Sequence, residues 1–243
     1  MASQHPGASG PMPQVPCSDP RGCPDLVVDS AWLLLGVQRT ESFPPTHCDV
    51  QDGFIQPGER QVLRFSYNTP NVGDGALRIG APRDHPEWFV WAPCHNHYHF
   101  REYADYRLWT PEGYVEWELL RQAEPEATAA EVLAAHPGLL AHFVAGQKMG
   151  FCVIDLLPAL PTALRAAVPP DPRTYTSCAN NQGLGRGWAD MYVYTVSGQY
   201  IDVTDVPSGA YVLEVEVNAE RLYRESDYAN NRAALPAVVL GAL

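Results

Sequence analysis

Three of the eight histidines in this chain, His95, His97 and His99, stand at alternate positions of one short segment. On an extended strand, residues two apart point to the same face, so these three imidazoles converge without help from distant parts of the fold. Neutral imidazoles bind copper, zinc or nickel, and the spacing does not choose among the three metals. The segment predicts a metal site on one strand; the alternative is a half-exposed strand that holds no ion.

A site of three histidines is compatible with more than one function. With an open fourth position it suits a hydrolase, in which a zinc or copper ion activates a bound water. No His-Glu-x-x-His pattern, which would place a catalytic Glu beside the ligands, is present in the sequence. A second alternative is a non-catalytic extracellular β-sandwich that binds metal or adheres to other molecules.

Composition indicates the kind of fold that must position these histidines. The 243 residues are 46% hydrophobic and 18% charged, and they include 23 prolines and 19 glycines. Such a chain can bury a substantial core, and its many turn-forming residues favour short strands joined by long loops over a helical bundle. We expect an all-β fold, with a single β-sandwich-like catalytic domain over residues 24–243 after an irregular N-terminal arm over residues 1–23.

The net charge of the chain indicates which kinds of partner to expect, and its cysteines indicate the cellular compartment. The net charge of −12 disfavours nucleic acid and favours cationic partners such as amines and lysine-rich chains. No apolar run is long enough to span a membrane, and residues 1–16 lack the apolar core of a signal peptide, so we expect a soluble chain. Six cysteines without a zinc-ribbon spacing predict three disulfides and a secreted or otherwise extracytoplasmic protein; free thiols in the cytosol are the alternative.

Strand-like segments lie on both sides of a different central stretch. Apolar alternation or strand-forming residues predict strands at residues 25–28, 61–67, 103–109, 191–196, 200–203 and 211–217, with the histidine segment running into residues 103–109. Residues 126–135 favour a helix that ends near residues 136–138, and an Ala/Pro-rich stretch follows at residues 156–172. We interpret the regions near 124–145 and 156–172 as helical or loop insertions on a β scaffold.

Seven segments in order resemble the catalytic domain of the lysyl oxidase family, copper amine oxidases that carry a lysine tyrosylquinone. Any one motif is modest evidence, whereas the ordered set is strong. The segments are residues 24–27 (PDLV), 94–99 (CHNHYH), 148–152 (KMGFC), 181–184 (NQGL), 190–192 (DMY), 201–211 (IDVTDVPSGAY) and 225–231 (ESDYANN).

The resemblance implies a cofactor that the protein makes from its own side chains. The family's copper ligands correspond to the three histidines, and its quinone precursors correspond to Lys148 and Tyr192. Copper(II) and dioxygen would oxidise the Tyr192 ring, and the neutral amine of Lys148 would add to it. Loss of the lysine proton near neutral pH requires that Lys148 be partly desolvated.

Turnover, as the resemblance implies it, is the oxidative deamination of a primary amine. A lysyl side chain of a protein or a small amine condenses with the quinone, a base removes a proton from the carbon that bears the nitrogen, and hydrolysis releases an aldehyde. Dioxygen reoxidises the cofactor, with release of hydrogen peroxide and ammonia. Asp190 and Glu102 are carboxylates near the motifs, and the sequence assigns neither of them as the base.

A calcium site is also implied by the resemblance, with oxygen ligands from both ends of the domain. Carboxylate, amide and carbonyl oxygens in this mixture suit calcium, and the ion would tie the start of the domain to its end. The alternative is an Asx-rich turn with solvated acids. The expected ligands are Asp25, Leu26 through its backbone carbonyl, Glu225, Asp227, Asn230 and Asn231.

Some positions depart from the family pattern. Trp188 and Gly198 stand where the family has cysteines, and Pro158 stands where a partner of Cys152 is expected. The two insertions have no family counterpart, and they put a protein-lysine substrate in doubt. The expected disulfides are Cys94–Cys178 from the resemblance, Cys48–Cys152 as the leftover pair, and Cys17–Cys23 as a loop in the N-terminal arm.

Overall fold

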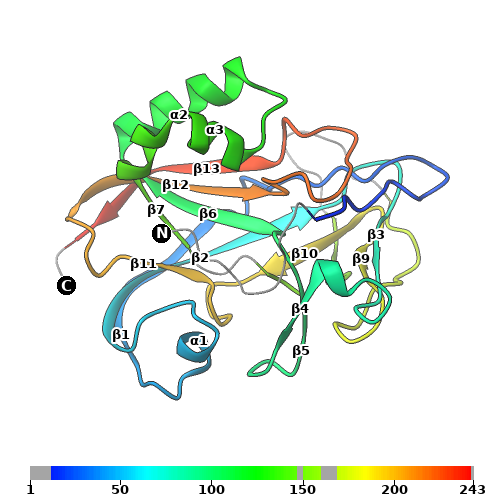
Figure 1. Ribbon diagram of the computed structural model, residues 1–243, viewed down its shortest axis with the longest axis horizontal. Helices are drawn as coiled ribbons and strands as arrows, with labels where there is room; N and C mark the ends of the chain where they lie inside the picture. Colours follow the sequence, from blue (N-terminus) through cyan, green and yellow to red (C-terminus); the bar gives the residue numbers. More distant parts are fainter. Residues whose placement is uncertain (1–11, 147–149, 160–168, 242–243) are drawn as a thin grey trace.

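The computed structural model describes residues 12–146, 150–159 and 169–241, and over these ranges it confirms the predicted all-β class (Figure 1). The first antiparallel sheet has the order β1-β2-β10-β8, and β11 also pairs with β2. The second has the order β13-β12-β6-β7. The strands of the first sheet are β1 (Leu34–Phe43), β2 (Gly58–Pro70), β8 (Leu157–Pro158), β10 (Trp188–Tyr192) and β11 (Tyr200–Asp202). Those of the second are β6 (Ala104–Trp109), β7 (Phe143–Ala145), β12 (Gly209–Val217) and β13 (Arg232–Leu240).

Apolar and aromatic side chains fill the space between the two sheets. The ring of Phe65 on β2 meets that of Tyr106 on β6 edge-on, with centroids 4.9 Å apart. From β12, Leu213, Val215 and Val217 enter the same core because they alternate along the strand. Burial of each such side chain contributes about 1.5–3 kcal/mol, and T-shaped ring pairs add to it. The fold is therefore a sandwich in which β2 and β6 face each other.

Two helices cover the outer face of the second sheet (Figure 1). They are α2 (Pro111–Ala123) and α3 (Ala129–Ala135), and a 3-10 helix at Pro137–Ala141 follows them. The helix predicted over residues 126–135 is shorter at its start because Thr128 forms a capping box with Glu131. The helix α2 was not predicted, although Thr110 caps it and a proline follows directly. No helix in the described ranges is long and apolar enough to cross a membrane.

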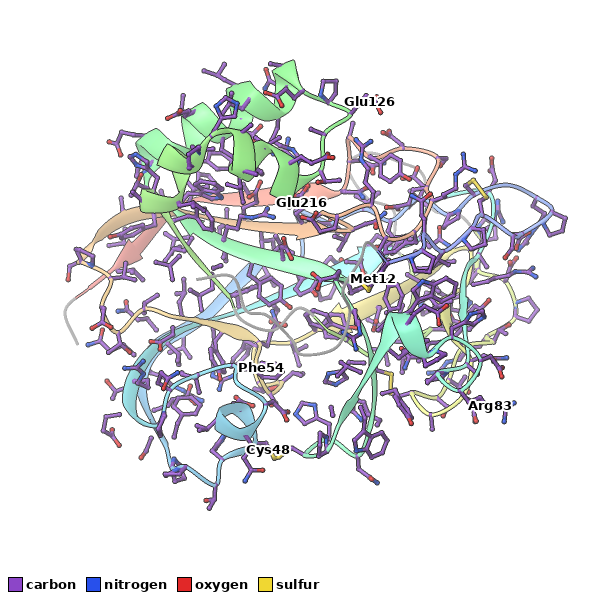
Figure 2. All side chains as sticks on the ribbon, viewed as in Figure 1. Met12, Cys48, Phe54, Arg83, Glu126 and Glu216 are labelled. Carbon is purple, nitrogen blue, oxygen red and sulfur yellow. A yellow bond between two sulfur atoms is a disulfide. The ribbon has the colours of Figure 1, made fainter. Side chains whose placement is uncertain are left out.

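A buried ionic network joins α2 to the sheet. The Glu214 carboxylate accepts hydrogen bonds from the indole N–H groups of Trp109 and Trp117, both at 2.9 Å. Arg107 donates to Glu216 at 2.7 Å, and Glu216 lies between β12 and the helices (Figure 2). Burial of an unpaired carboxylate would cost much free energy. Both carboxylates here have charged or N–H partners, which offset that cost.

Three strand predictions need correction. Residues 25–28 form only an isolated bridge, from Leu26 to Asn71, because this segment runs beside the end of β2 through loop-type hydrogen bonds. Residues 193–196 are a turn, since β10 ends at Tyr192. The histidine segment is a hairpin rather than one strand that continues into β6. The strands of this hairpin are β4 (Phe89–Ala92) and β5 (His97–Phe100). A separate two-stranded sheet pairs β3 (Leu77–Gly80) with β9 (Gln182–Leu184).

All six cysteines are paired, which confirms three disulfides and the Cys17–Cys23 loop. The other two predicted pairings are wrong: the bonds are Cys48–Cys94 and Cys152–Cys178. The tip of the β4–β5 hairpin lies beside the short helix α1 (Cys48–Gln51), so Cys94 reaches Cys48 with 5.4 Å between Cα atoms. Cys152 lies beside the loop that precedes β9, at 5.3 Å from Cys178. Both distances are within the normal range for a disulfide.

Candidate metal centre and active site

The β4–β5 hairpin carries the three histidines, but in a different way from the single strand predicted. His97 and His99 lie on β5 and share a face, while Tyr98 points to the other side and packs on Trp91. His95 lies in the turn, where the next residue, Asn96, has a φ of 54°. Asparagine tolerates this left-handed conformation better than most residues. The turn thus folds His95 back over the face that His97 and His99 already occupy.

The three imidazoles meet at a spacing that suits one metal ion. His99 Nε2 lies 3.0 Å from His97 Nε2 and 3.2 Å from His95 Nδ1. Ligand atoms about 2.0 Å from one ion, at angles of about 90–110°, are about 2.8–3.3 Å apart. All three candidate ligand atoms lie within 4.8 Å of one another. The donors therefore fit a copper or zinc ion, and the set alone does not choose between them.

The backbone around β5 holds the hairpin in place. Phe100 and Phe151 exchange two backbone hydrogen bonds, of 2.7 and 2.9 Å. Gly150 lies so close to the hairpin that a methyl group on its Cα would come 3.1 Å from Cβ of His99. The segment that follows Lys148 in the sequence is therefore packed directly against a candidate metal ligand.

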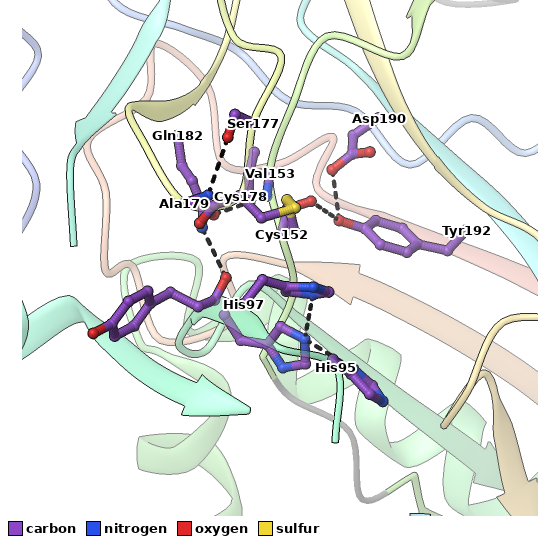
Figure 3. The surroundings of a disulfide bond; sticks show 12 residues. His95, His97, Cys152, Val153, Ser177, Cys178, Ala179, Gln182, Asp190 and Tyr192 are labelled. Carbon is purple, nitrogen blue, oxygen red and sulfur yellow. Dashed lines mark hydrogen bonds between the residues drawn. A yellow bond between two sulfur atoms is a disulfide. The ribbon is translucent and has the colours of Figure 1, made fainter. Parts of the chain in front are cut away.

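Tyr192, the last residue of β10, is buried beside this segment. Its ring stacks on Tyr67 at 5.3 Å and meets Phe151 edge-on at 4.6 Å. Its hydroxyl oxygen lies 2.5 Å from Asp190 Oδ2 and 2.9 Å from the backbone oxygen of Cys152 (Figure 3). Aromatic contacts thus fix the position of the Tyr192 ring, and hydrogen bonds fix its hydroxyl group.

One open cavity, of 420 Å³, connects the histidines to Tyr192. Its walls include His95, His97, His99, Asp190 and Tyr192, together with apolar side chains such as Ile154 and Leu156. A small organic molecule that entered this cavity would meet the metal ligands and the tyrosine together. Cavities that are mostly apolar with a few convergent polar groups are typical of ligand sites.

Burial dominates the electrostatics at the tyrosine end of the cavity. It raises the pKa of Asp190 to about 8, although hydrogen bonds from Tyr192 and from two backbone N–H groups oppose the shift. It also raises the pKa of Tyr192 well above that of a free phenol, and the adjacent Asp190 adds to that shift. A carboxyl group that titrates near neutral pH in a cavity is a functional candidate.

Of the other residues named from the sequence, one lies outside the described residues, one does not line the histidine cavity, and one does. Lys148 lies outside the described residues. Glu102 has a φ of 49° and a pKa raised to about 7 by burial, with Asp105 and Glu220 adding to the shift. It is not among the residues that line the histidine cavity. Asp190, in contrast, reaches Tyr192 because residues two apart on β10 point to one face.

The expected calcium ligands come from two segments that lie together although about 200 residues separate them. Glu225 Oε2 accepts a hydrogen bond from the Leu26 N–H at 2.6 Å, and the Asn230 amide donates to Asp25 Oδ1 at 2.8 Å. Glu225 Oε1 accepts from the amide of Asn231 at 2.7 Å. Asp227 instead caps its own turn by accepting from the backbone N–H of Ala229. Hydrogen bonds thus join Asp25 to Asn230, and Glu225 to both Leu26 and Asn231.

The two carboxyl side chains of this oxygen cluster, Asp25 and Glu225, are buried. Burial, with a smaller contribution from Asp25, raises the pKa of Glu225 to about 8. The amide oxygens of Asn230 and Asn231 are buried, and neither accepts a hydrogen bond from any described residue. A hard divalent cation would satisfy such oxygens and offset the repulsion between the two carboxylates. The donor set therefore fits calcium.

Comparison with known proteins agrees with this geometry. A sequence profile of the lysyl oxidase family matches residues 138–238. Protein-lysine 6-oxidase of Rattus norvegicus is 31% identical over 223 residues, which cover 86% of this chain and 45% of that protein. Lysyl oxidase homolog 2 of Gallus gallus is 31% identical over 180 residues, and lysyl oxidase homolog 3 of Homo sapiens is 31% identical over 177 residues. These matches cover 73% and 72% of the chain.

The chain spans less than half the length of these relatives, and only 18% of each lysyl oxidase homolog. The profile match includes Lys148, Tyr192 and the segment of residues 225–231, whereas the histidine hairpin lies before it. The chain is a divergent member of the lysyl oxidase family.

Proposed function

We propose that this protein is a copper- and quinone-dependent amine oxidase, which converts primary amines to aldehydes with release of ammonia and hydrogen peroxide. The observation that carries the proposal is a single cavity that is lined both by the three histidines and by Tyr192. A metal hydrolase would use the histidines, but it would have no use for a buried tyrosine in the same cavity. Family membership supports the same class of reaction.

Copper would be held by His95 Nδ1, His97 Nε2 and His99 Nε2, and Tyr192 and Lys148 would supply the quinone. Bound copper would contribute one-electron chemistry with dioxygen, and the mature quinone would contribute the carbonyl that captures the amine. Lys148 is the only lysine in the chain, so no other ε-amine can compete for the oxidised ring. The residues that follow it support this pairing, because Gly150 contacts His99 and Phe151 contacts Tyr192.

A lysine-specific endoprotease offers a direct test of this assignment. It should cut the untreated chain once, at Lys148, because there is no second lysine. After copper loading in air, a link from the Lys148 nitrogen to Tyr192 should make the chain resistant, and mass spectrometry should find one joined peptide. Full cleavage of a copper-loaded, catalytically active sample would contradict the proposal.

Asp190 would hold and move the proton at the Tyr192 oxygen. A phenol has one hydrogen, and two acceptors compete for it: Asp190 Oδ2 at 2.5 Å and the Cys152 carbonyl oxygen at 2.9 Å. The shorter contact is the one with Asp190, which lies next to the phenol oxygen as the nearest proton acceptor. The raised pKa of Asp190 keeps its carboxyl group protonated, and therefore a weak acceptor, below about pH 8. When Asp190 ionises, it becomes the acceptor that the Tyr192 hydroxyl needs as the ring is oxidised.

We therefore expect cofactor formation to accelerate as the pH rises through the pKa of Asp190, at about 8 or lower because a bound cation favours the carboxylate. Asp190→Asn cannot ionise, so its rate should stay low and flat from about pH 6 to about pH 10. The appearance of the joined peptide in copper-loaded protein under air measures the rate. The charged and titratable neighbours whose own ionisation must be compared are Tyr67, Tyr103, Tyr106, Asp155 and Tyr192.

Tyr103→Phe is the matched control for that experiment. The Tyr103 ring lies 6.2 Å from that of Tyr192, but its hydroxyl bonds to Thr69 rather than to Tyr192. It should retain the wild-type pH profile. A wild-type rise that Asp190→Asn reproduces would show that another group takes the proton.

Calcium is proposed as a structural ion at the cluster of Asp25, Leu26, Glu225, Asp227, Asn230 and Asn231. We expect a chelator to lower the melting temperature of the protein and calcium to restore it, because an ion that binds only the folded state stabilises it. At a free concentration of about 100 times Kd the gain is about 2.7 kcal/mol, or about 5–10 °C for a chain of this size. Thermal melts with and without calcium measure the shift.

Substitutions at single residues of this cluster should show which of them bind the calcium ion. Asp25→Asn should lose most of the calcium-dependent shift, and Asp227→Ala should lose less, because Asp227 has its hydrogen bond with Ala229. Asp84→Asn, on an exposed ion pair, should keep all of it. If Asp25→Asn and Asp227→Ala both melt like the wild type and bind calcium normally, the ion is bound elsewhere or not at all.

The disulfides and the net charge also support a proposal for where the protein works and what it acts on. We propose that residues 24–243 form one catalytic domain after an N-terminal arm, and that the protein works in a secreted or otherwise extracytoplasmic location, where its three disulfides are stable. Its partners would be dioxygen and a primary amine, either a small molecule or a lysine side chain of a protein. The net charge of −12 favours such cations.

A further inference from the structure

His95 differs from the other two candidate ligands in how its ring is held. His97 and His99 lie on β5, so the strand sets the direction of both side chains. His95 lies in the hairpin turn, where no strand pairing fixes the backbone. Hydrogen bonds from the His95 and Asn96 N–H groups to the Ala92 carbonyl shape the turn, and the contacts of the ring itself decide which nitrogen faces the other two histidines.

The two nitrogens of the His95 ring have different surroundings. Nδ1 faces the other imidazoles, at 3.2 Å from His99 Nε2. Nε2 points away from them and lies 3.1 Å from the hydroxyl oxygen of Ser197, in the turn after β10. The carboxylate of Asp52, just after α1, is 3.6 Å from the same nitrogen. The ring therefore has one nitrogen directed to the metal position and one directed to oxygens of the protein.

Counting hydrogens along this chain of contacts fixes the tautomer. The buried Asp49 carboxylate, which can only accept, receives hydrogen bonds from the hydroxyl of Ser197, the Gly198 N–H at 3.2 Å and the Tyr200 hydroxyl at 2.8 Å. Ser197 has a single hydroxyl hydrogen, and Asp49 takes it. Its oxygen can then offer only a lone pair to His95. Nε2 must carry the hydrogen, so Nδ1, on the side of the other two imidazoles, is the nitrogen whose lone pair can bind a metal.

We propose that Asp49 and Ser197 are positioning residues that hold His95 in the tautomer whose Nδ1 binds the metal. The inference rests on the proposed metal site. It also explains the local architecture, because the Cys48–Cys94 disulfide joins the residue before Asp49 to the residue before His95. The α1 segment thus holds the turn both covalently and through the hydrogen bonds. Gly198, which stands where the family has a cysteine, contributes its N–H to this arrangement.

The test is the affinity of the purified protein for Zn²⁺ and Cu²⁺, measured by competition with a chromophoric chelator, with the Cu²⁺ electron paramagnetic resonance spectrum as a second readout. Loss of an outer hydrogen bond to a metal ligand typically weakens binding about 10- to 100-fold. Ser197→Ala should show this loss and an altered spectrum, whereas Ser197→Thr, which keeps the hydroxyl, should restore both. Ser66→Ala is the matched control, because its hydroxyl accepts from the Tyr194 N–H in the same turn without contacting a histidine.

A double variant makes the result specific. In a His95→Ala background, Ser197→Ala should have no further effect on metal affinity, since the ring it holds is gone. Asp49→Asn, which replaces an acceptor-only carboxylate by an amide, should weaken binding in the same way as Ser197→Ala. Equal affinities for Ser197→Ala and Ser66→Ala would overturn the inference while leaving the metal site standing. A wild type that binds neither ion at the histidines would overturn the proposed function instead.

Discussion

Lys148→Ala should lose all amine-dependent release of hydrogen peroxide while it keeps its full content of copper. The three histidines hold the metal, so the substitution leaves the ligand set intact. The oxidised Tyr192 ring would have no amine to receive, because the chain contains no second lysine. Peroxide release with a primary amine, copper content by elemental analysis, and the joined peptide by mass spectrometry measure the three parts of this expectation.

Lys148→Arg is the sharper version of the same test. Arginine retains the positive charge and much of the length of the lysine side chain, but its guanidinium stays protonated and cannot act as a neutral nucleophile. It should therefore be as inactive as Lys148→Ala. Phenylhydrazine, a carbonyl reagent, should give a coloured adduct with the aerated wild type and with neither variant. Oxidase activity that survives either substitution would refute the role of Lys148.

The parts of the fold that the sequence predicts well are those with a local period. Strands β2, β6 and β12 contain the predicted residues 61–67, 103–109 and 211–217 almost entirely, because one face of each must be apolar to reach the core. The helix α2 was missed because its apolar residues do not share one face: Val115 and Leu119 are exposed, whereas Trp117 is buried and donates to the Glu214 carboxylate. Tertiary partners, rather than a sequence period, stabilise that helix.

The candidate site divides in the same way. The convergence of the histidines follows from short-range spacing, and it survives even though His95 lies in a turn rather than on the strand. The pairing of Asp190 with Tyr192 follows from alternation along β10. The contacts of Ser197 and Asp49 had no sequence signal, because 148 residues separate them and only the packing of α1 against the turn after β10 brings them together.

The disulfides illustrate why long-range pairing resists prediction. Six cysteines allow many connectivities, and the even count fixes only the number of bonds. The resemblance to the family gave Cys94 the wrong partner because the Cys48 segment, with α1, occupies the side of the hairpin turn. The Cys48–Cys94 bond lies directly beside Asp49 and His95 in the sequence, so the disulfide and the proposed positioning residues belong to one local arrangement.

His97→Ala should abolish cofactor formation together with metal binding, which distinguishes it from Lys148→Ala. His97 Nε2 lies 3.0 Å from His99 Nε2, so its loss removes one of three donors and leaves two that hold copper poorly. The fall in copper affinity should exceed the roughly 100-fold upper bound that applies to outer partners of a ligand. Without the metal, the Tyr192 ring would not be oxidised, and the lysine-specific endoprotease should cut the aerated chain completely.

His136→Ala is the matched control, since it removes a histidine that ends α3 and pairs with Glu124 far from the histidine cluster in sequence. This variant should bind copper, form the joined peptide and release peroxide as the wild type does. His97→Ala with added copper and air is the decisive sample, because any alternative source of cofactor would appear there. If it still yields the Lys148–Tyr192 link at the wild-type rate, the metal that drives the oxidation is not bound by this hairpin, and the proposed centre is wrong.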